Sequence, residues 1–324
     1  MNKSYRHKDG DGKASYAQAI QTGAFPLFHH PWWLDIVCQA GSWDVCTVQD
    51  KAGRVVGALP YYGTSRMGLK LIRMPPFTPW LGVWLDDSAC PERLSRRYSF
   101  ENQVIGQLVD QLPRVAWYHQ IHPEGLQNWL PFYWRGYRQT TRYTYVLAAH
   151  DPQLIFSDLK SEARTRIRKG YSLYEVVEDH TFSRFFVFYQ RTMIHHGMSK
   201  HKGKVFRELH DAIQSHTAGT IYYAVDEKGI DCAAVYMIWD NQTAYYWLPC
   251  MDKVLGSNGA VQLLTWHVIQ EAMKMGKTFN FEGSMLPHIE PVFRAFGAER
   301  RPVFQIRKFG NRFLEAAWVL FNGK

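Results

Sequence analysis

The chain has few cysteines, and their spacing gives them no joint role. Its five cysteines are scattered, odd in number and free of any Cys-x-x-Cys pair. This usage is typical of reduced thiols and excludes a disulfide framework or a cysteine-based zinc site. His195 and His196 are neighbours, and no His-x-x-x-His pair or carboxylate at ligand spacing accompanies them. We therefore expect no bound metal.

Long apolar runs are also missing. Met1–Ser15 is polar and basic, which does not fit a secretory signal. No stretch approaches the ~18 consecutive apolar residues that a membrane span requires. A cytoplasmic protein is the expectation.

Several catalytic motifs are absent. The sequence contains no Gly-x-Ser-x-Gly motif, no Cys/His pairing and no phosphate-binding P-loop. Covalent hydrolases and nucleoside triphosphatases are therefore poor candidates.

The composition that is present favours a folded protein with an anionic partner. The chain has 324 residues, of which 46% are apolar and 15% aromatic. That content can build a sizeable core, and the length suits one large or two medium domains. The net charge of +9 favours a phosphorylated ligand, a nucleic acid or a membrane surface as partner.

A hairpin pattern occurs twice. Asp50 and Gly53 form a turn between two apolar segments, and Asp226 and Gly229 repeat that turn 176 positions later. A helix-then-hairpin order in each half makes a duplicated unit the natural interpretation. His150-Asp151-Pro152 marks the boundary. We expect two domains, residues 1–150 and 151–324.

The stretch 243–296 organises the second half. It predicts a strand over Thr243–Leu248 that Pro249 stops, a loop at Gly256–Gly259 and a buried helix starting at Ala260. A short strand over Thr278–Glu282 follows. Free amides at a helix start make an anion site, although the same residues are equally typical of a simple helix cap.

This part of the chain resembles the C-terminal half of a GNAT-fold acyltransferase. The resemblance lies in the order of its segments, which is a strand, GSNGA, a helix, FNFEGSM and PHIEPVFRAFGAE. More specifically, it is similar to the bacterial Fem-like branch, as are HPWWLDIVC and MPPFTPWLG near the start. The similarity extends patchily from about Pro31 to Ile306. It implies an α/β fold with a mixed sheet in each of two tandem GNAT-like domains.

The resemblance also implies an acyl donor and its binding loop. In ordinary GNAT enzymes the loop (Q/R)-x-x-G-x-(G/A) holds the coenzyme A pyrophosphate. This chain has Lys253 and Gly256, then Asn258 in place of Gly or Ala. The implied donor-binding residues are Cys250, Gly256, Ser257, Asn258, Gly259 and Ala260. Acyl-CoA and aminoacyl-tRNA both remain open as donors, and acyl-CoA is favoured because no coiled-coil arm is found. DNA is not expected as a partner.

Acyl transfer to an amine requires a polarised carbonyl and a deprotonated amine held together. In the GNAT pattern a backbone N–H at a bulge in the fourth strand meets the carbonyl, and Pro249 is the expected cause of a splay there. Glu282 is the candidate base, with its pKa raised by partial burial. Ser284 and His288 follow closely, placed to orient a substrate or relay a proton. The alternative is that Glu282 and Asn280 cap a turn or pair with an arginine.

Substrate contacts are expected from basic and aromatic residues. Arg164, Arg168 and Lys169 cluster at the start of the second domain, and Tyr246 lies on the central strand. A solvated helix face is the alternative for the basic cluster. As a whole, the sequence predicts an acyltransferase acting on a small-molecule or peptide amine. A non-catalytic binding module that retains the fold is the rival.

Overall fold

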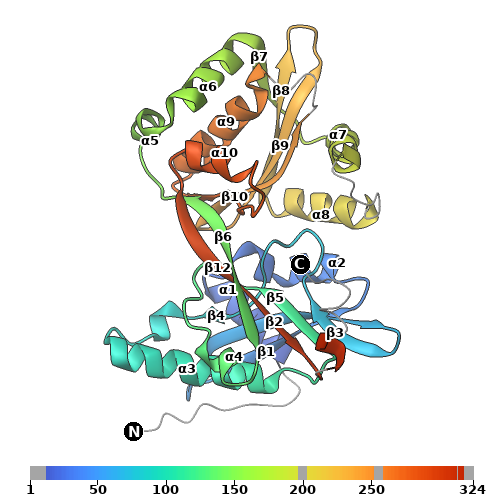
Figure 1. Ribbon diagram of the computed structural model, residues 1–324, viewed down its shortest axis with the longest axis vertical. Coiled ribbons are helices and arrows are strands. Elements are labelled where there is room, and N and C mark those ends of the chain that lie inside the picture. Colours follow the sequence, from blue (N-terminus) through green and yellow to red (C-terminus); the bar gives the residue numbers. More distant parts are fainter. Residues whose placement is uncertain (1–11, 196–202, 252–257, 312, 317–324) are drawn as a thin grey trace. The chain divides into compact units, whose positions relative to one another are not determined.

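The computed structural model describes residues 12–195, 203–251, 258–311 and 313–316. They form two compact units (Figure 1). The first contains the described residues up to Arg142 together with those from Pro302 onward, and the second is Tyr143–Arg301. The chain passes between the units within two strands, β6 (Arg138–Leu147) and β12 (Glu299–Phe309). The expected boundary at residues 150/151 lies just after β6, the first strand that joins the units. The return of the chain to the first unit within β12 was not expected.

The first unit is a mixed sheet covered by helices, with strand order β1-β2-β3-β5-β12 and β4 beside β2. Helix α3 packs its apolar face against this sheet, where Val104 and Leu108 are fully buried. Its elements are α1 (Gly12–Thr22), η1 (Leu27–His29), α2 (Pro31–Val37), β1 (Ser42–Gln49), β2 (Val55–Arg66), β3 (Leu69–Arg73), β4 (Trp84–Leu85), η2 (Asp87–Ala89), α3 (Leu94–Gln111), β5 (Trp117–Ile121) and α4 (Leu130–Tyr133).

The second unit is built on the strand order β6-β11-β10-β9-β8-β7. Helices α6 and α9 cover one face of this sheet, and α7 and α8 cover the other (Figure 1). Its elements are α5 (Pro152–Asp158), α6 (Ser161–Leu173), β7 (Tyr174–Glu178), α7 (Phe182–His195), α8 (Gly203–Ser215), β8 (Gly219–Asp226), β9 (Asp231–Trp239), β10 (Thr243–Met251), α9 (Ala260–Lys274), β11 (Thr278–Asn280) and α10 (Glu290–Ala295).

The two units repeat one topology. In the first, β1, β2 and β3 are antiparallel neighbours, and α3 connects β3 to the parallel strand β5. In the second, β8, β9 and β10 are antiparallel neighbours, and α9 connects β10 to the parallel strand β11. The first hairpin shifts register between Val48 and Gln49, and the second does so between Ala224 and Val225. The two shifts lie 176 positions apart, which is also the separation of the two turns.

The turns themselves match bond for bond. Asp50 Oδ1 accepts hydrogen bonds from the amides two and four residues later, at 2.9 and 3.0 Å. Asp226 Oδ1 accepts the equivalent pair at 3.0 and 2.8 Å. Gly53 and Gly229 have φ of 84° and 77°, a left-handed conformation that glycine adopts without strain. The two hairpins therefore occupy equivalent places in their sheets, as the sequence spacing predicts.

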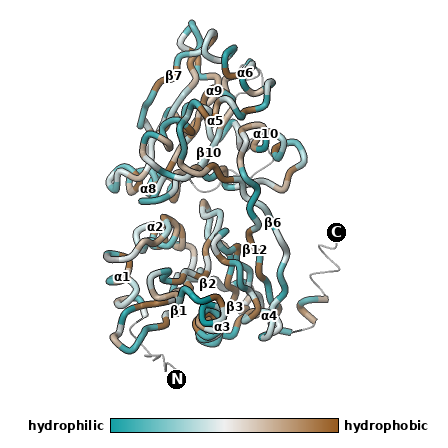
Figure 2. Tube along the Cα trace, turned by 90° about the vertical axis from the view of Figure 1, so that its left-hand side faces the viewer, coloured by the Kyte–Doolittle hydropathy of each residue, from teal (hydrophilic) through white to brown (hydrophobic). Residues whose placement is uncertain are grey.

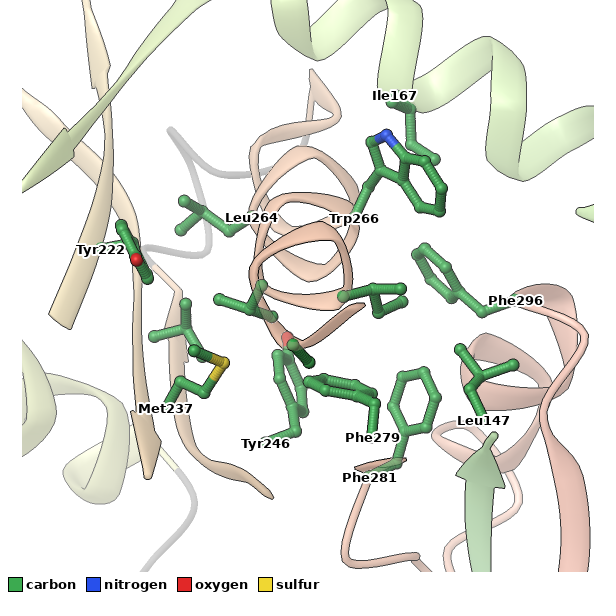
Figure 3. Close-up of a cluster of buried hydrophobic side chains, with 14 of the residues drawn as sticks. Leu147, Ile167, Tyr222, Met237, Tyr246, Leu264, Trp266, Phe279, Phe281 and Phe296 are labelled. Carbon is green, nitrogen blue, oxygen red and sulfur yellow. The ribbon is translucent and has the colours of Figure 1, made fainter. Parts of the chain in front are cut away.

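The core of the second unit lies between its sheet and α9. Figure 3 shows Tyr246, Phe279 and Phe281 meeting beneath α9, with Trp266 close to Ile167 of α6. Each large apolar side chain buried this way contributes about 1.5–3 kcal/mol. By contrast, α6 is mostly hydrophilic (Figure 2) and buries only Ala163, Ile167 and Gly170. The helix starting at Ala260 is buried, as predicted.

Two strand limits differ from those expected. β10 continues through Pro249 to Met251, and β11 ends at Asn280. No described residue of β11 pairs with β10 beyond Tyr245, so that edge of β10 tolerates a residue without an N–H group. Proline therefore does not end the strand. Among the described residues, no helix is both long and apolar enough to cross a membrane.

Candidate functional site

The parallel strands β10 and β11 run together for only three residue pairs. Thr243–Tyr245 pair with Thr278–Asn280. On its other side β11 pairs with β6, and the chain stays with β6 beyond β11, where the Phe281 amide donates to the Tyr145 carbonyl at 2.9 Å. β10 instead stays with β9 up to Met251 and bulges at Trp247, because Tyr246 pairs with Met237 and Leu248 with Tyr236. The strands diverge at Tyr245, four residues before the proline to which we attributed the splay.

Glu282 stands where the chain leaves β11, and its backbone is strained. Its φ is 58°, and that of Gly283 is 71°. A non-glycine residue in this left-handed region costs about 1–3 kcal/mol and persists where its surroundings impose it. The next residue has no room for a side chain, because a Cβ on Gly283 would overlap the Tyr143 carbonyl and lie 2.7 Å from the Thr144 Cα. The backbone is pressed against β6.

One oxygen of the Glu282 carboxyl group is shielded from water, while the residue as a whole is half-buried. Its Oε1 atom is buried and has no hydrogen-bond partner among the described residues. Burial raises the pKa of Glu282 well above its usual range, because the charged form loses hydration. A buried carboxyl oxygen without a hydrogen-bond partner is uncommon, and ionisable groups with a strongly shifted pKa cluster at functional sites.

Asn280 and Thr144 fix the backbone of Glu282. Asn280 is 4% exposed, and its Oδ1 accepts from the Thr144 hydroxyl at 2.6 Å and from the Glu282 amide at 2.8 Å. The alternative role stated for these residues is therefore correct for Asn280, which caps the turn. Among the described residues, no arginine bonds to Glu282 Oε1. The amide of Asn280 positions the strained residue and leaves its carboxyl available.

Ser284 and His288 belong to the turn before α10. The Ser284 hydroxyl accepts from the Leu286 amide at 3.1 Å, which is a structural contact within the turn. His288 is exposed. Both lie close to Glu282 in the chain, but their roles in substrate orientation or proton relay stay predictions.

The expected donor loop is described in part. Gly256 and Ser257 lie outside the described residues. Asn258 is exposed, and its Oδ1 accepts from Lys169 Nζ of α6 at 3.2 Å. Gly259 is the N-cap of α9, and it gives the helix no side-chain hydrogen bond. The structure thus brings Lys169, expected at the substrate, to the start of the donor helix beside Ala260.

Gly259 lies in close contact with α6. Its φ is 98°, and an added Cβ would overlap the Arg166 carbonyl oxygen and lie 3.2 Å from the Gly170 amide. The glycine allows α9 to begin directly against α6. A larger residue at this position would therefore disturb the packing of α9 against α6. The role of Gly259 in donor binding stays a prediction.

Tyr246 and Cys250 are core residues. The Tyr246 hydroxyl lies 2.9 Å from Thr265 Oγ1, and since that threonine donates to the Val261 carbonyl, the tyrosine is the donor. Burial raises the pKa of the Cys250 thiol to about 12, so it stays protonated. Both side chains are buried, and the binding roles expected for Tyr246 and Cys250 stay predictions.

Arg164 and Arg168 lie against α5. Arg164 Nη1 donates to the Ser157 carbonyl, and the Arg168 guanidinium stands 5.8 Å from the centre of the Phe156 ring. Of the three basic residues expected at the substrate, only Lys169 has a described contact with the donor loop. Their substrate roles stay predictions.

Sequence reasoning missed Thr144 and Trp247. Thr144 bonds to a residue 136 positions away, and no local pattern signals that contact. The bulge at Trp247 has no glycine to mark it. In the described part of the chain, no group of three or more His, Cys, Asp or Glu is arranged to hold a metal ion.

Comparison with known proteins identifies the fold around this site. Residues 135–283 match the family described as acetyltransferase (GNAT) domain. That range contains β10, α9, β11 and Glu282. A search of curated proteins finds no match to this chain.

Solved structures extend the likeness over both units. A structure titled FemX matches with a TM-score of 0.67 at 10% identity, covering 93% of this chain and 96% of that one. A conserved protein of unknown function from Bacteroides thetaiotaomicron matches at 0.55 and 8% identity, with 95% and 100% covered. A tandem GNAT protein from the clavulanic acid pathway, solved without AcCoA, matches at 0.51 and 14% identity, with 92% and 93% covered. At these identities the likeness concerns the fold, which is that of tandem GNAT proteins.

Proposed function

Since residues 135–283 form a GNAT acetyltransferase domain within a tandem GNAT fold, we propose that this chain transfers an acyl group to an amine. Glu282 is the general base in this proposal. The observation that carries it is the strained backbone of Glu282 combined with its buried, unpartnered carboxyl oxygen. Structural ion pairs and caps rarely leave a carboxyl oxygen in that condition.

The reaction requires one proton acceptor and one stabilised oxyanion. The amine nitrogen attacks the acyl carbonyl carbon, a C–N bond forms, and the bond to the leaving group breaks with its electron pair. Glu282 takes the proton that the amine loses, and because burial raises its pKa, its carboxylate is a stronger proton acceptor than an exposed one. In this proposal a backbone N–H at the bulge around Trp247 faces the developing oxyanion.

The donor we propose is an acyl-CoA thioester, with aminoacyl-tRNA as the alternative. The start of α9 supports an anionic donor, because Gly259 leaves the helix without a side-chain cap and Lys169 reaches the same loop. Gly256 and Ser257 complete the proposed donor loop. A thermal-shift panel with acetyl-CoA, longer acyl-CoAs and charged tRNA separates the donors. A ligand at 100 times its Kd adds ~2.7 kcal/mol of stability.

Glu282→Gln tests the base directly, because it keeps the shape and removes the proton acceptor. With acetyl-CoA and a primary amine, we expect kcat/KM to fall about 10²- to 10⁴-fold. The acidic limb of the pH profile, along which the rate rises as the Glu282 carboxyl loses its proton, should vanish as well. Donor binding by calorimetry should be unchanged, since the donor loop is untouched.

Glu290→Gln is the matched control. Glu290 is a carboxylate eight residues later that accepts from the Tyr145 hydroxyl at 3.0 Å and pairs with Arg294 at 3.2 Å. Its replacement should leave the pH profile intact. If both variants retain wild-type kcat/KM and pH dependence, Glu282 is not the base.

A non-catalytic binding module is the second candidate, favoured by the departure at Asn258 from the usual donor loop. Donor binding without turnover of any amine would support it. The early divergence of β10 and β11 supports transfer instead, because continuous pairing leaves no access between these strands.

A further inference from the structure

The turn after Glu282 exposes two apolar side chains. Met285 and Leu286 are each 50% exposed. The apolar residues that follow on and after α10 point inward instead, with Phe293 at 7% and Phe296 at 1%. The segment therefore separates its apolar residues into a buried set and an exposed pair. The exposed pair has no role in the core.

Hydrogen bonds hold this turn in a defined shape. The Leu286 amide donates to Ser284 Oγ at 3.1 Å. The Leu286 carbonyl accepts from the amides of Ile289 and Glu290 at 3.0 and 3.1 Å, which starts α10. At the other end, Gly283 is pressed against Tyr143 of β6. Met285 and Leu286 are thus presented on an anchored turn.

The exposed pair is also close to the candidate base. Met285 and Leu286 follow Glu282 by three and four residues, a span of at most about 14 Å of extended chain. The Cα atoms of the pair therefore lie within about 14 Å of the Glu282 Cα, a distance that an alkyl chain attached to an amine can cover. A continuous site would therefore combine a proton acceptor with an apolar contact.

We propose that Met285 and Leu286 bind the apolar body of the acceptor, so that the acceptor class is amines carrying an alkyl or aromatic portion. This inference rests on the proposed acyl transfer with Glu282 as base. Burial of acceptor methylenes against the pair raises kcat/KM about two- to fourfold per methylene, until the pair is covered. Small polar amines gain nothing from it.

The test uses the full-length protein, acetyl-CoA and linear primary amines from propylamine to octylamine, with release of coenzyme A as readout. In the wild type kcat/KM should rise with chain length, and in Met285→Ser/Leu286→Ser the rise should disappear. Met67→Ser/Leu69→Ser is the matched control, since it removes an exposed apolar pair (94% and 45%) from the β2–β3 hairpin of the first unit. It should keep the wild-type dependence.

Equal rates across the amine series in the wild type, or an unchanged dependence in Met285→Ser/Leu286→Ser, would overturn the inference. If the wild type releases no coenzyme A with any amine, the proposed function fails with acetyl-CoA. Calorimetric binding of octylamine and propylamine then decides the inference separately. The inference is supported if the wild type binds octylamine more tightly than propylamine and Met285→Ser/Leu286→Ser does not. It is overturned if the wild type and this variant show the same preference.

Discussion

The contact between α6 and α9 predicts a large cost for a single methyl group. Gly259 is buried with φ of 98°, and a Cβ there would overlap the Arg166 carbonyl oxygen. Gly259→Ala therefore combines left-handed strain of about 1–2 kcal/mol with overpacking of about 1–3 kcal/mol. We expect a total loss of about 2–5 kcal/mol in the free energy of unfolding. That is a large fraction of the 5–15 kcal/mol typical of a domain.

Two control variants separate strain from packing. Gly229→Ala has the same kind of backbone, with φ of 77°, but its Cβ would meet nothing within 4 Å. It should cost about 1–2 kcal/mol from strain alone. Gly170→Ala does the opposite, because Gly170 lies within α6 while its Cβ would lie 2.8 Å from the Gly259 carbonyl oxygen and 2.8 Å from Leu263 Cβ. Its packing cost should exceed the ~1 kcal/mol that alanine gains over glycine in a helix.

Urea unfolding followed by circular dichroism measures all three variants, with donor binding checked by calorimetry. Gly259→Ala should be the least stable of the three variants. Equal losses of stability in Gly259→Ala and Gly229→Ala, together with a gain in Gly170→Ala, would show that α6 and α9 are not in tight contact.

The remaining predictions concern pH, the donor loop and the turn at the base. Burial lowers the pKa of His29 from 6.5 to about 4 and that of His122 to about 3, so the unfolded chain binds protons that the folded chain does not. The free energy of unfolding should therefore fall as the pH drops from about 6.5 to 4, by about 3 kcal/mol for His29 alone. In His29→Gln, unfolding monitored by tryptophan fluorescence should show a weaker dependence of this free energy on pH. Lys169→Met should weaken acetyl-CoA binding and flatten its salt dependence, and Arg164→Gln should do neither; equal effects would rule out a specific role for Lys169. Asn280→Ala should lower kcat more than it raises KM, whereas a change in KM alone would show that Asn280 does not position the base.

Local sequence patterns determined the repeated architecture. The Asp-x-x-Gly turns at Asp50 and Asp226 specify their own hydrogen bonds, because an aspartate side chain and a left-handed glycine act within five residues. The buried helix starting at Ala260 follows from apolar residues around its whole circumference. The carboxylate at Glu282 could also be selected from sequence, as a charged residue between buried elements.

Tertiary packing decided the chemistry of those residues. The strained backbone of Glu282 adjoins Gly283, which packs closely against β6, a strand from another part of the chain. Its amide is held by Asn280, which is itself fixed by Thr144 from the same distant strand. Pro249 does not end β10, because the pairing of β10 with β11 has already stopped at Tyr245. The pKa, backbone strain and accessibility of Glu282 are set by burial and by contacts with β6. The residues that make these contacts lie more than a hundred positions away in the sequence, so local patterns cannot predict them.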